Sequence, residues 1–259
     1  MEENYQGQRF ACVITAGGSG SRFGGNRPKQ FEELLGYPLY IWSIYTCTHI
    51  GNIKDIVVTM PTEYVELGRR QIAEYLDIDT NKDRTPGASG LGKRAVNLNV
   101  IEGGATRQAS VYCGLMELKQ VAPDFVIVHD GARPLVGAEY FRRCMETLTT
   151  RGACTIGLPI SDTIKEVEDG KIISTLDRSR LWSVQTPQGA PFSLLLSCHE
   201  EAAARGISVT DDAAILETFG HRVEVFEGFA HNIKVTVADD FKTCQLLAPL
   251  YLSRSPMEP

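Results

Sequence analysis

A glycine-rich stretch near the start of the chain, residues 16–30, carries the residue types of an anion-binding site. Glycine lets another group approach the backbone closely, and clustered backbone N–H groups bind anions. An ordinary strand-to-helix turn is the alternative, but cations after Gly-x-Gly favour a phosphate site. The residues with chemistry in this stretch are Ala16, Gly17, Gly18, Gly20, Arg22 and Lys29.

Comparable groups of small, cationic, acidic and hydroxyl residues follow later apolar runs of the chain. They occupy segments 103–110, 129–134, 161–165, 185–188 and 232–234. In parallel sheets, ligands bind beyond the carboxyl ends of the strands, so these segments should share one edge. They are rich in cations and poor in nucleophiles. This composition suits nucleotidyl transfer, in which the protein mainly positions substrates and neutralises charge.

Structural roles are the alternative for several of these residues. His129 can be a hydrogen-bonded core histidine, and Asp130 can form a simple ion pair with a nearby arginine. Ser110 and the pair 211–212 suit helix starts, where polar side chains meet free N–H groups. Lys234 beside an apolar segment can extend its ammonium to solvent.

Other motifs are incomplete. Phe23 replaces the last glycine of the dinucleotide fingerprint, which disfavours an NAD-dependent oxidoreductase. The Gly-x-Ser-x-Gly pattern of hydrolases is truncated. Segment 87–94 resembles a P-loop, but Arg94 stands where a magnesium-binding hydroxyl is needed. We expect residues 80–96 to be a polar surface loop without that function.

Apolar runs alternate with helical patterns along most of the chain. Strands are predicted at 10–14, 53–60, 98–101, 125–128, 153–158, 181–185 and 223–226. Helices are predicted at 39–49, 62–75, 107–121, 138–149, 192–205, 211–219 and 239–251. This order predicts an α/β fold with a doubly wound, mostly parallel sheet, in a single domain over 1–259. Residues 160–174 break the rhythm and predict a protruding β-hairpin, which is too small to bury a core alone.

Composition narrows the classes further. The chain has 259 residues and a formal net charge of −6, which argues against nucleic-acid binding. The polar N-terminus predicts no secretory signal, and no apolar run reaches membrane-spanning length. Seven scattered cysteines without metal-site spacing predict a reduced, cytoplasmic protein without a zinc site.

The motifs AGGSGSR…PKQ, GGATRQASVYCGL, VHDGARP, SDTIK, LDRSRLW, QTPQ, TDDAA and NIKVT together resemble one family in order and spacing. That family is the 2-C-methyl-D-erythritol 4-phosphate cytidylyltransferases, and the resemblance runs from about residue 9 to 251. It implies a Rossmann-like nucleotidyltransferase fold. It also implies transfer of CMP from CTP to methylerythritol phosphate with release of pyrophosphate, a step of non-mevalonate isoprenoid synthesis. Mg²⁺ is the implied cofactor, and a homodimer that interlocks through 160–178 is the implied assembly.

The resemblance also implies a role for each site residue. Arg22, Lys29 and Lys234 are the implied catalytic cations. The implied CTP contacts are Ala16, Gly17, Gly18, Gly20, Gly104, Ser110, Asp130, Ala132 and Arg133. Asp130 is also the implied protein contact of Mg²⁺, which the CTP phosphates would hold for the most part. The implied acceptor contacts are Thr186, with Thr163 and Arg178 contributed by a partner subunit's hairpin.

Departures from the family pattern leave alternatives open. Gly17 stands where the family usually has alanine. The related ribitol 5-phosphate cytidylyltransferases have glycine at this position, as this chain does. Ribitol 5-phosphate is therefore the alternative acceptor, although segments 161–165 and 210–213 resemble the methylerythritol enzymes more. A non-catalytic nucleotide-binding module is the competing class, and the presence of Arg22, Lys29 and Lys234 disfavours it.

Overall fold

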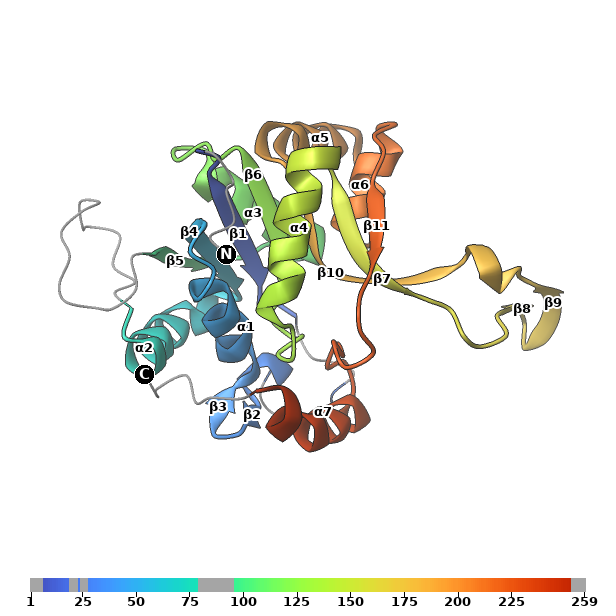
Figure 1. Cartoon of the computed structure of the whole chain (residues 1–259), viewed down its shortest axis with the longest axis horizontal. Helices are drawn as coiled ribbons and strands as arrows, with labels where there is room; N and C mark the ends of the chain where they lie inside the picture. The colour runs from blue at the N-terminus through green and yellow to red at the C-terminus, as the bar shows by residue number, and fades with distance from the viewer. Residues whose placement is uncertain (1–6, 19–22, 24–27, 79–95, 253–259) are drawn as a thin grey trace.

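The computed structural model of the chain describes residues 7–18, 23, 28–78 and 96–252. A seven-stranded sheet lies at its centre, in the order β11-β7-β10-β6-β1-β4-β5 (Figure 1). The strands are β1 (Phe10–Thr15), β4 (Ile53–Met60), β5 (Asn97–Glu102), β6 (Phe125–Asp130), β7 (Cys154–Pro159), β10 (Trp182–Pro191) and β11 (Glu224–Glu227). All pairings are parallel except those of β10, which runs antiparallel to both β6 and β7. The predicted α/β fold with a mostly parallel sheet is confirmed.

Helices cover both faces of the sheet. One face carries α1 (Leu39–Thr48), α2 (Val65–Leu76) and α4 (Ala138–Arg151), and the other carries α3 (Arg107–Leu118), α5 (Phe192–Arg205) and α6 (Asp212–Thr218). The central strand β1 shows why both faces are covered. Its residues alternate between the two cores, with Cys12 and Ile14 on one side and Ala11 and Val13 on the other.

A smaller apolar cluster involves the elements drawn below the sheet in Figure 1. There α7 (Ala238–Tyr251) packs beside the short ribbon of β2 (Glu33–Leu34) and β3 (Tyr37–Pro38). Trp42 is buried in this cluster, and its indole N–H donates to the carbonyl of Leu34 at 2.8 Å. Among the described helices, none is both long and apolar enough to cross a lipid bilayer.

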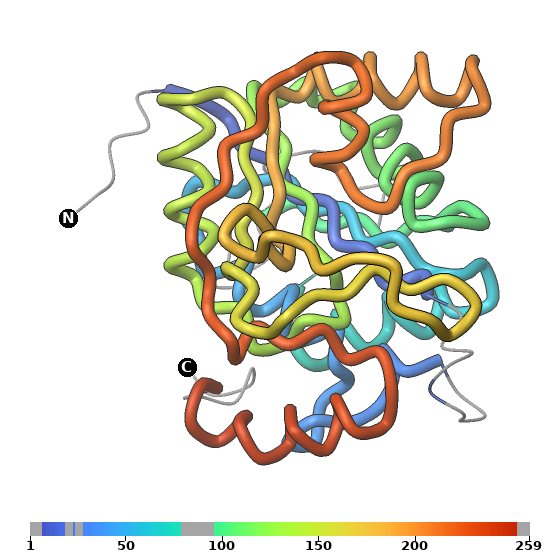
Figure 2. The backbone as a smooth tube through the Cα atoms, turned by 90° about the vertical axis from the view of Figure 1, so that its right-hand side faces the viewer, coloured from blue at the N-terminus to red at the C-terminus, as the bar shows by residue number. Residues whose placement is uncertain are grey.

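A β-hairpin projects from the body between β7 and β10, as Figure 1 shows from the side and Figure 2 from its tip. We call residues 160–181 the arm. It contains β8 (Lys165–Glu168), β9 (Lys171–Thr175) and the 3-10 turn η3 (Arg178–Arg180). Asp169 and Gly170 form the two-residue hairpin loop with φ of 49° and 74°, which is the left-handed region that such loops need. The predicted hairpin is confirmed.

The sequence-based prediction was wrong at several points. The predicted strand 181–185 is part of the longer β10, which runs antiparallel, so 185–188 lies within a strand and not at a parallel carboxyl end. Helix 62–75 begins instead as the 3-10 turn η2 (Thr62–Tyr64) before α2. The loop predicted at 80–96, with its P-loop-like segment, lies outside the described residues except for Val96.

Candidate active site

The carboxyl ends of the central strands continue into loops that keep the hydrogen-bond ladder for one more step. The N–H of Ala16 donates to Thr59 O at 2.8 Å, and the N–H of Gly131 donates to Thr15 O at 2.9 Å. The N–H of Gly103 donates to Met60 O at 2.7 Å. The backbone beyond each strand is therefore held close to its neighbour, which fixes the floor of the site.

A cavity of about 360 Å³ opens at this edge of the sheet. Eight of the predicted site residues line it: Ala16, Gly17, Gly18, Lys29, Ser110, Asp130, Ala132 and Lys234. Among the described residues, residues 16–18 of the glycine loop thus lie together with the segments after β5 and β6 and with the 232–234 loop. Clustering of distant segments at one edge agrees with the expectation for parallel strands.

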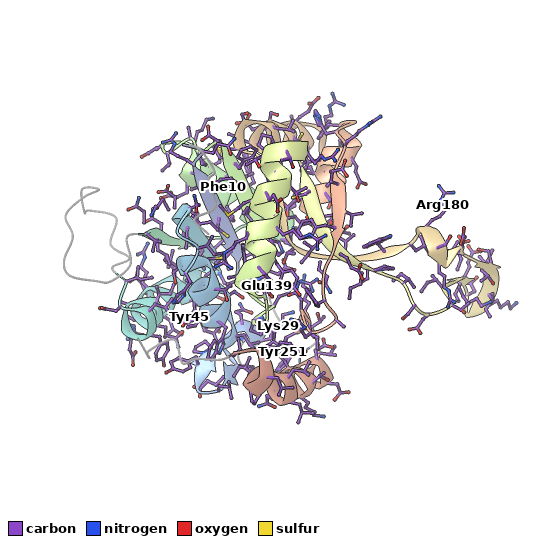
Figure 3. All side chains as sticks on the ribbon, in the orientation of Figure 1. Phe10, Lys29, Tyr45, Glu139, Arg180 and Tyr251 are labelled. Atoms are coloured by element: carbon purple, nitrogen blue, oxygen red, sulfur yellow. The ribbon has the colours of Figure 1, made fainter. Side chains whose placement is uncertain are left out.

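Other predicted residues lie outside the cavity lining. Gly104 is next to it, and its carbonyl accepts a hydrogen bond from Ser110 Oγ at 3.2 Å. Arg133 and Thr186 are buried behind Asp130. Thr163 and Arg178 are on the arm, which does not reach the cavity of its own chain. Arg180 on the same arm stands far to the side of Lys29 in Figure 3.

Gly20 and Arg22 fall outside the described residues. Their predicted contacts with CTP therefore stay predictions. Segment 161–165 was expected at the edge of the site because it follows β7. The structure instead places it in the arm, because the chain leaves the sheet there before it could turn toward the cavity.

Asp130 ends β6 and is the centre of the charges in the cavity. Lys234 Nζ lies 2.7 Å from its Oδ2, and Arg107 Nε donates to its Oδ1 at 2.9 Å. Arg133 Nε is a third cationic neighbour, at 3.6 Å from Oδ2. Burial by itself raises the pKa of Asp130, but these cations outweigh it and hold the pKa well below its ordinary value. Asp130 is therefore an ionised carboxylate inside the protein.

Arg107 is a site residue that the sequence analysis placed in a strand-end segment without giving it a role. It is the first residue of α3, whose N-cap is Thr106, with the N–H of Ala109 bonded to the Thr106 side chain. Its Nη2 also lies 2.8 Å from Oδ2 of Asp212. Burial by itself lowers the pKa of Arg107, but the carboxylates of Asp212 and Asp130 outweigh burial. The pKa of Arg107 therefore lies above its ordinary value. The position of Arg107 at the start of the predicted helix 107–121, in the segment that follows a predicted strand, was the available signal.

Small residues let α3 approach the loop closely. A Cβ at Gly103 would come within 2.8 Å of Ser110 Oγ, and one at Gly104 within 2.4 Å of Ala109 Cβ. Ser110 was expected as a possible helix cap, but Thr106 has that role. Ser110 Oγ instead donates to Thr106 O at 2.9 Å, inside the first turn.

His129 has a structural role, as the alternative in the sequence analysis stated. Its ring is fully buried, with Nδ1 3.0 Å from Thr186 Oγ1 and Nε2 3.4 Å from Arg133 O. Burial lowers the pKa of His129 to about 3, so the ring is neutral at physiological pH. A ring that donates from Nε2 accepts at Nδ1 from the Thr186 hydroxyl.

Thr186 supports the site from the neighbouring strand. Its Oγ1 accepts from the N–H of Asp130 at 3.0 Å, so β10 fixes the backbone beneath the key carboxylate. The hydroxyl is thus already bonded within the protein. The acceptor contact predicted for Thr186 stays a prediction.

The loop that carries Lys234 is tied down by Asn232, which is fully buried. The Asn232 side chain donates to Gln185 Oε1 and to Thr186 O, each at 3.0 Å, while the backbone carbonyl of Asn232 accepts from Arg133 Nη1 at 2.8 Å. The N–H of Val235 adds a bond of 2.9 Å to Ala132 O. These contacts flank Lys234 in sequence and set the point from which its side chain extends.

On the opposite side, Lys29 and Gln30 lie in the 3-10 turn η1 (Lys29–Phe31). Gln30 Nε2 donates to Ala16 O at 2.7 Å, which links this turn to the glycine loop. A Cβ at Gly18 would lie 4.0 Å from Lys29 Cε, so the lysine stem runs past the glycine. Lys29 and Lys234 therefore both line the cavity, from different segments of the chain.

Asp130 can contribute one ligand to Mg²⁺, and the other ligands would have to come from the substrate phosphates or water. Asp130 is an ionised carboxylate on the cavity wall. The described residues contain no group of three or more His, Cys, Asp or Glu side chains that could hold a metal ion by themselves. Mg²⁺ is commonly held by one or two carboxylates together with substrate phosphates, and Asp130 fits that arrangement.

Fold and cavity together are those of an α/β nucleotidyltransferase, in which amides and cations hold phosphates beyond the carboxyl ends of strands. Comparison with known proteins makes the class specific. Residues 10–249 match the model of the family 2-C-methyl-D-erythritol 4-phosphate cytidylyltransferase. The chain belongs to this family.

Individual relatives agree with the family model. The enzyme of that name from Synechococcus elongatus is 38% identical over 236 residues, which are 91% of this chain and 94% of the relative. The crystal structure of the enzyme of that name from Thermus thermophilus has a TM-score of 0.68 at 28% identity, covering 92% of this chain and 98% of its own. A 4-diphosphocytidyl-2C-methyl-D-erythritol synthase from Anaerococcus prevotii shares the fold, with a TM-score of 0.73, 24% identity and coverage of 95% and 99%.

Proposed function

We propose that this chain transfers the cytidylyl group of CTP to 2-C-methyl-D-erythritol 4-phosphate. An oxygen of the acceptor phosphate attacks the α-phosphorus of CTP, and a new P–O bond forms. The bond from the α-phosphorus to the oxygen shared with the β-phosphate breaks, and its electron pair leaves with pyrophosphate. Family membership supports the proposal, and the observation that carries it is the cavity flanked by Lys29, Lys234 and Asp130.

The cations of the site provide the catalysis in this proposal. Negative charge increases on the α-phosphate as the attacking oxygen approaches, and preorganised cations in a partly buried site stabilise that charge. Lys29 and Lys234 have the positions for this role, and Arg22 is proposed to join them. The glycines of the first loop leave room for the nucleotide against the backbone.

Mg²⁺ is the proposed cofactor, with Asp130 as its protein contact and the CTP phosphates as its other ligands. When bound, it neutralises phosphate charge and favours departure of pyrophosphate. Asp130 is already ionised and fixed at Oδ1 by Arg107, so it needs no proton loss before it meets a cation.

A homodimer is the proposed assembly, with the arm of one subunit reaching the acceptor side of the other. Exposed apolar side chains on the arm support this, since Val167, Ile172 and Ile173 are 56%, 65% and 55% exposed. Apolar side chains gathered on a projecting hairpin mark an interaction site. Thr163 and Arg178 lie on the same arm and have no access to their own cavity.

A cytoplasmic location is also proposed. Its support is chemical, because all seven cysteines are free thiols and six of them are buried. Free thiols persist in reducing compartments.

Pyrophosphate release tests the activity. The purified chain is assayed with CTP, Mg²⁺ and one acceptor at a time, either methylerythritol phosphate or ribitol 5-phosphate. We expect release with methylerythritol phosphate and none with ribitol 5-phosphate. The opposite result would make ribitol phosphate the acceptor, and CTP binding in calorimetry without release on either acceptor would identify a non-catalytic nucleotide-binding module.

A further inference from the structure

Arg107 is held between two buried carboxylates that come from different elements. Nε binds Asp130 at the end of β6, and Nη2 lies 2.8 Å from Asp212 at the start of α6. The side chains of Asp130 and Asp212 are only 6% and 4% exposed, while that of Arg107 is 21% exposed and lines the cavity. The guanidinium therefore has solvent and ligand on one side and fixed negative charge on two others.

Asp212 is itself rigidly placed. Its N–H donates to Gln188 Oε1 at 2.8 Å, and the amide of Gln188 donates to Asp211 Oδ2 at 2.7 Å. Asp211 is the N-cap of α6, where it accepts from the N–H of Ala214 at 3.0 Å. These bonds join the start of α6 to β10, so the backbone that carries the Asp212 carboxylate is held in place.

Asp212 does not line the cavity. Besides Arg107, the side chain of Asp212 has one other titratable neighbour in the described residues, His199 on α5, whose Nε2 lies 3.6 Å from Oδ1. Arg107 is the neighbour of Asp212 that lines the cavity, and it is therefore the contact through which Asp212 reaches the site.

Negative charge in the cavity competes for the same guanidinium. A triphosphate beside Arg107 attracts it away from Asp130, because phosphate and carboxylate both accept bidentate bonds from arginine. If Arg107 left, Asp130 would lose its charged partner at Oδ1, where the hydroxyl of Thr15 lies at 3.4 Å, while Lys234 also turned toward the phosphates. The carboxylate would then keep only the longer contacts to Thr15 Oγ1 and to Arg133 Nε, at 3.4 and 3.6 Å, and would be held less firmly when its position matters.

We propose that Asp212 is a positioning residue that holds Arg107 back from the nucleotide, so that Asp130 keeps its orientation when CTP binds. This proposal rests on the proposed function in that it takes CTP as the ligand. Lys234 is the cation free to move from Asp130 to the phosphates, and Arg107 is the one that stays. Asp212 thus gives two of the cations at Asp130 different roles, with Lys234 as the mobile one and Arg107 as the fixed one.

The test is an Asp212→Asn variant, which keeps the shape of the side chain and removes its charge. Released Arg107 should bind phosphate, so the Kd for CTP by calorimetry and the KM for CTP should be equal to the wild-type values or lower. The kcat for pyrophosphate release should fall at least about tenfold, since a misplaced group in a site costs about that or more. A merely structural role would instead weaken CTP binding and activity together.

Two controls make the result specific. Glu217→Gln on the exposed side of the same helix should leave Kd and kcat unchanged. In an Arg107→Ala background, Asp212→Asn should have no further effect on either value, because the residue through which it acts is gone. Asp212→Ser is the second variant if Asp212→Asn melts at a lower temperature than the wild type.

Three results would overturn the proposal. These are a tenfold weaker Kd for CTP in Asp212→Asn, a wild-type kcat in that variant, or an equal loss of kcat in both backgrounds. Calorimetry on the wild type separates this from the function itself. A chain that binds CTP but does not turn over fails as a cytidylyltransferase, while the Kd comparison still decides the role of Asp212.

Discussion

Asp130 shows how one side chain organises the charge of a nucleotide site. It is buried, yet ionised, because Arg107 and Lys234 contact different oxygens of the same carboxylate. The negative charge in turn keeps the cations oriented in the absence of ligand. A site of this kind needs little rearrangement when phosphates arrive, and that is what electrostatic preorganisation requires.

Lys29 should be essential for turnover and dispensable for folding. Lys29 lines the cavity, where its ammonium can stabilise charge on the phosphates, and its loss should lower kcat at least about 100-fold. The measurement is the pyrophosphate release rate of Lys29→Ala, with its melting temperature. Lys242→Ala removes a surface cation paired with Asp239 and is the matched control. Near-normal kcat in Lys29→Ala would show that its charge is not used.

His129 should contribute a pH dependence of stability. Its folded pKa is about 3, against about 6.5 in the unfolded chain, so only the unfolded state gains this proton between those values. Stability should therefore decrease as the pH falls through this window, by up to about 1.4 kcal/mol per pH unit.

Urea unfolding at pH 7 and pH 5 measures this effect. The difference between the two pH values should be smaller in His129→Gln than in the wild type, and unchanged in His221→Gln, which alters an exposed histidine. An NMR titration of the His129 ring with a midpoint near 6.5 would contradict the prediction, whether or not the variant folds.

At the scale of elements, the packing of α3 on the sheet depends on Gly114. A Cβ at Gly114 would lie 2.5 Å from Val13 Cγ1, and Val13 is fully buried in β1. Gly114→Ala should therefore lower the free energy of unfolding by about 1–3 kcal/mol through overpacking. It should also lower kcat, because α3 carries Arg107.

Chemical denaturation and the release assay measure the two effects of Gly114→Ala. Gly51→Ala is the control, since a Cβ there would meet no atom within 4 Å. Equal stability of the two variants would mean that α3 can move away from β1 without cost.

Most elements could be predicted because their periodicity is local. The apolar run of β4 and the amphipathic pattern of α5 gave their observed bounds, Ile53–Met60 and Phe192–Arg205. The direction of β10 could not be predicted, since an apolar run is the same in either direction. Thr186 and Pro187 also interrupt the run, which placed the end of the predicted strand too early, at Gln185.

The site was predictable to the extent that it consists of strand ends. The cavity gathers the segments after β1, β5 and β6 as expected. The pairing of Arg107 with Asp212 joins residues more than one hundred positions apart in the chain, through the packing of α6 on β10. No local pattern contains that information. The departure of 161–165 into the arm is likewise a property of the three-dimensional path.

At the scale of the whole molecule, the arm is an insertion between two strands that already pair. Pro159 of β7 and Trp182 of β10 face each other in register, and the N–H of Ile160 donates to Leu181 O at 3.0 Å. Replacement of residues 161–180 by an Asn-Gly turn should therefore leave the sheet intact.

The shortened chain should be a folded monomer with little activity, since the proposed dimer contacts and Thr163 and Arg178 are removed together. Light scattering measures its mass and circular dichroism its melting. A double change, Ile172→Lys with Ile173→Lys, keeps the arm and removes its two apolar side chains of β9 that are more than half exposed. A shortened chain that still dimerises would place the interface elsewhere.

Strand β10 connects the base of the arm to the cavity. Trp182 stands at the base of the arm, and four residues later the hydroxyl of Thr186 holds the backbone of Asp130. In the proposed dimer, a displacement of the arm by the partner's substrate would travel along one strand to the carboxylate of the other cavity. Such linkage is reciprocal, so the two cavities would report their occupancy to each other, and substrate saturation would depart from a simple hyperbola.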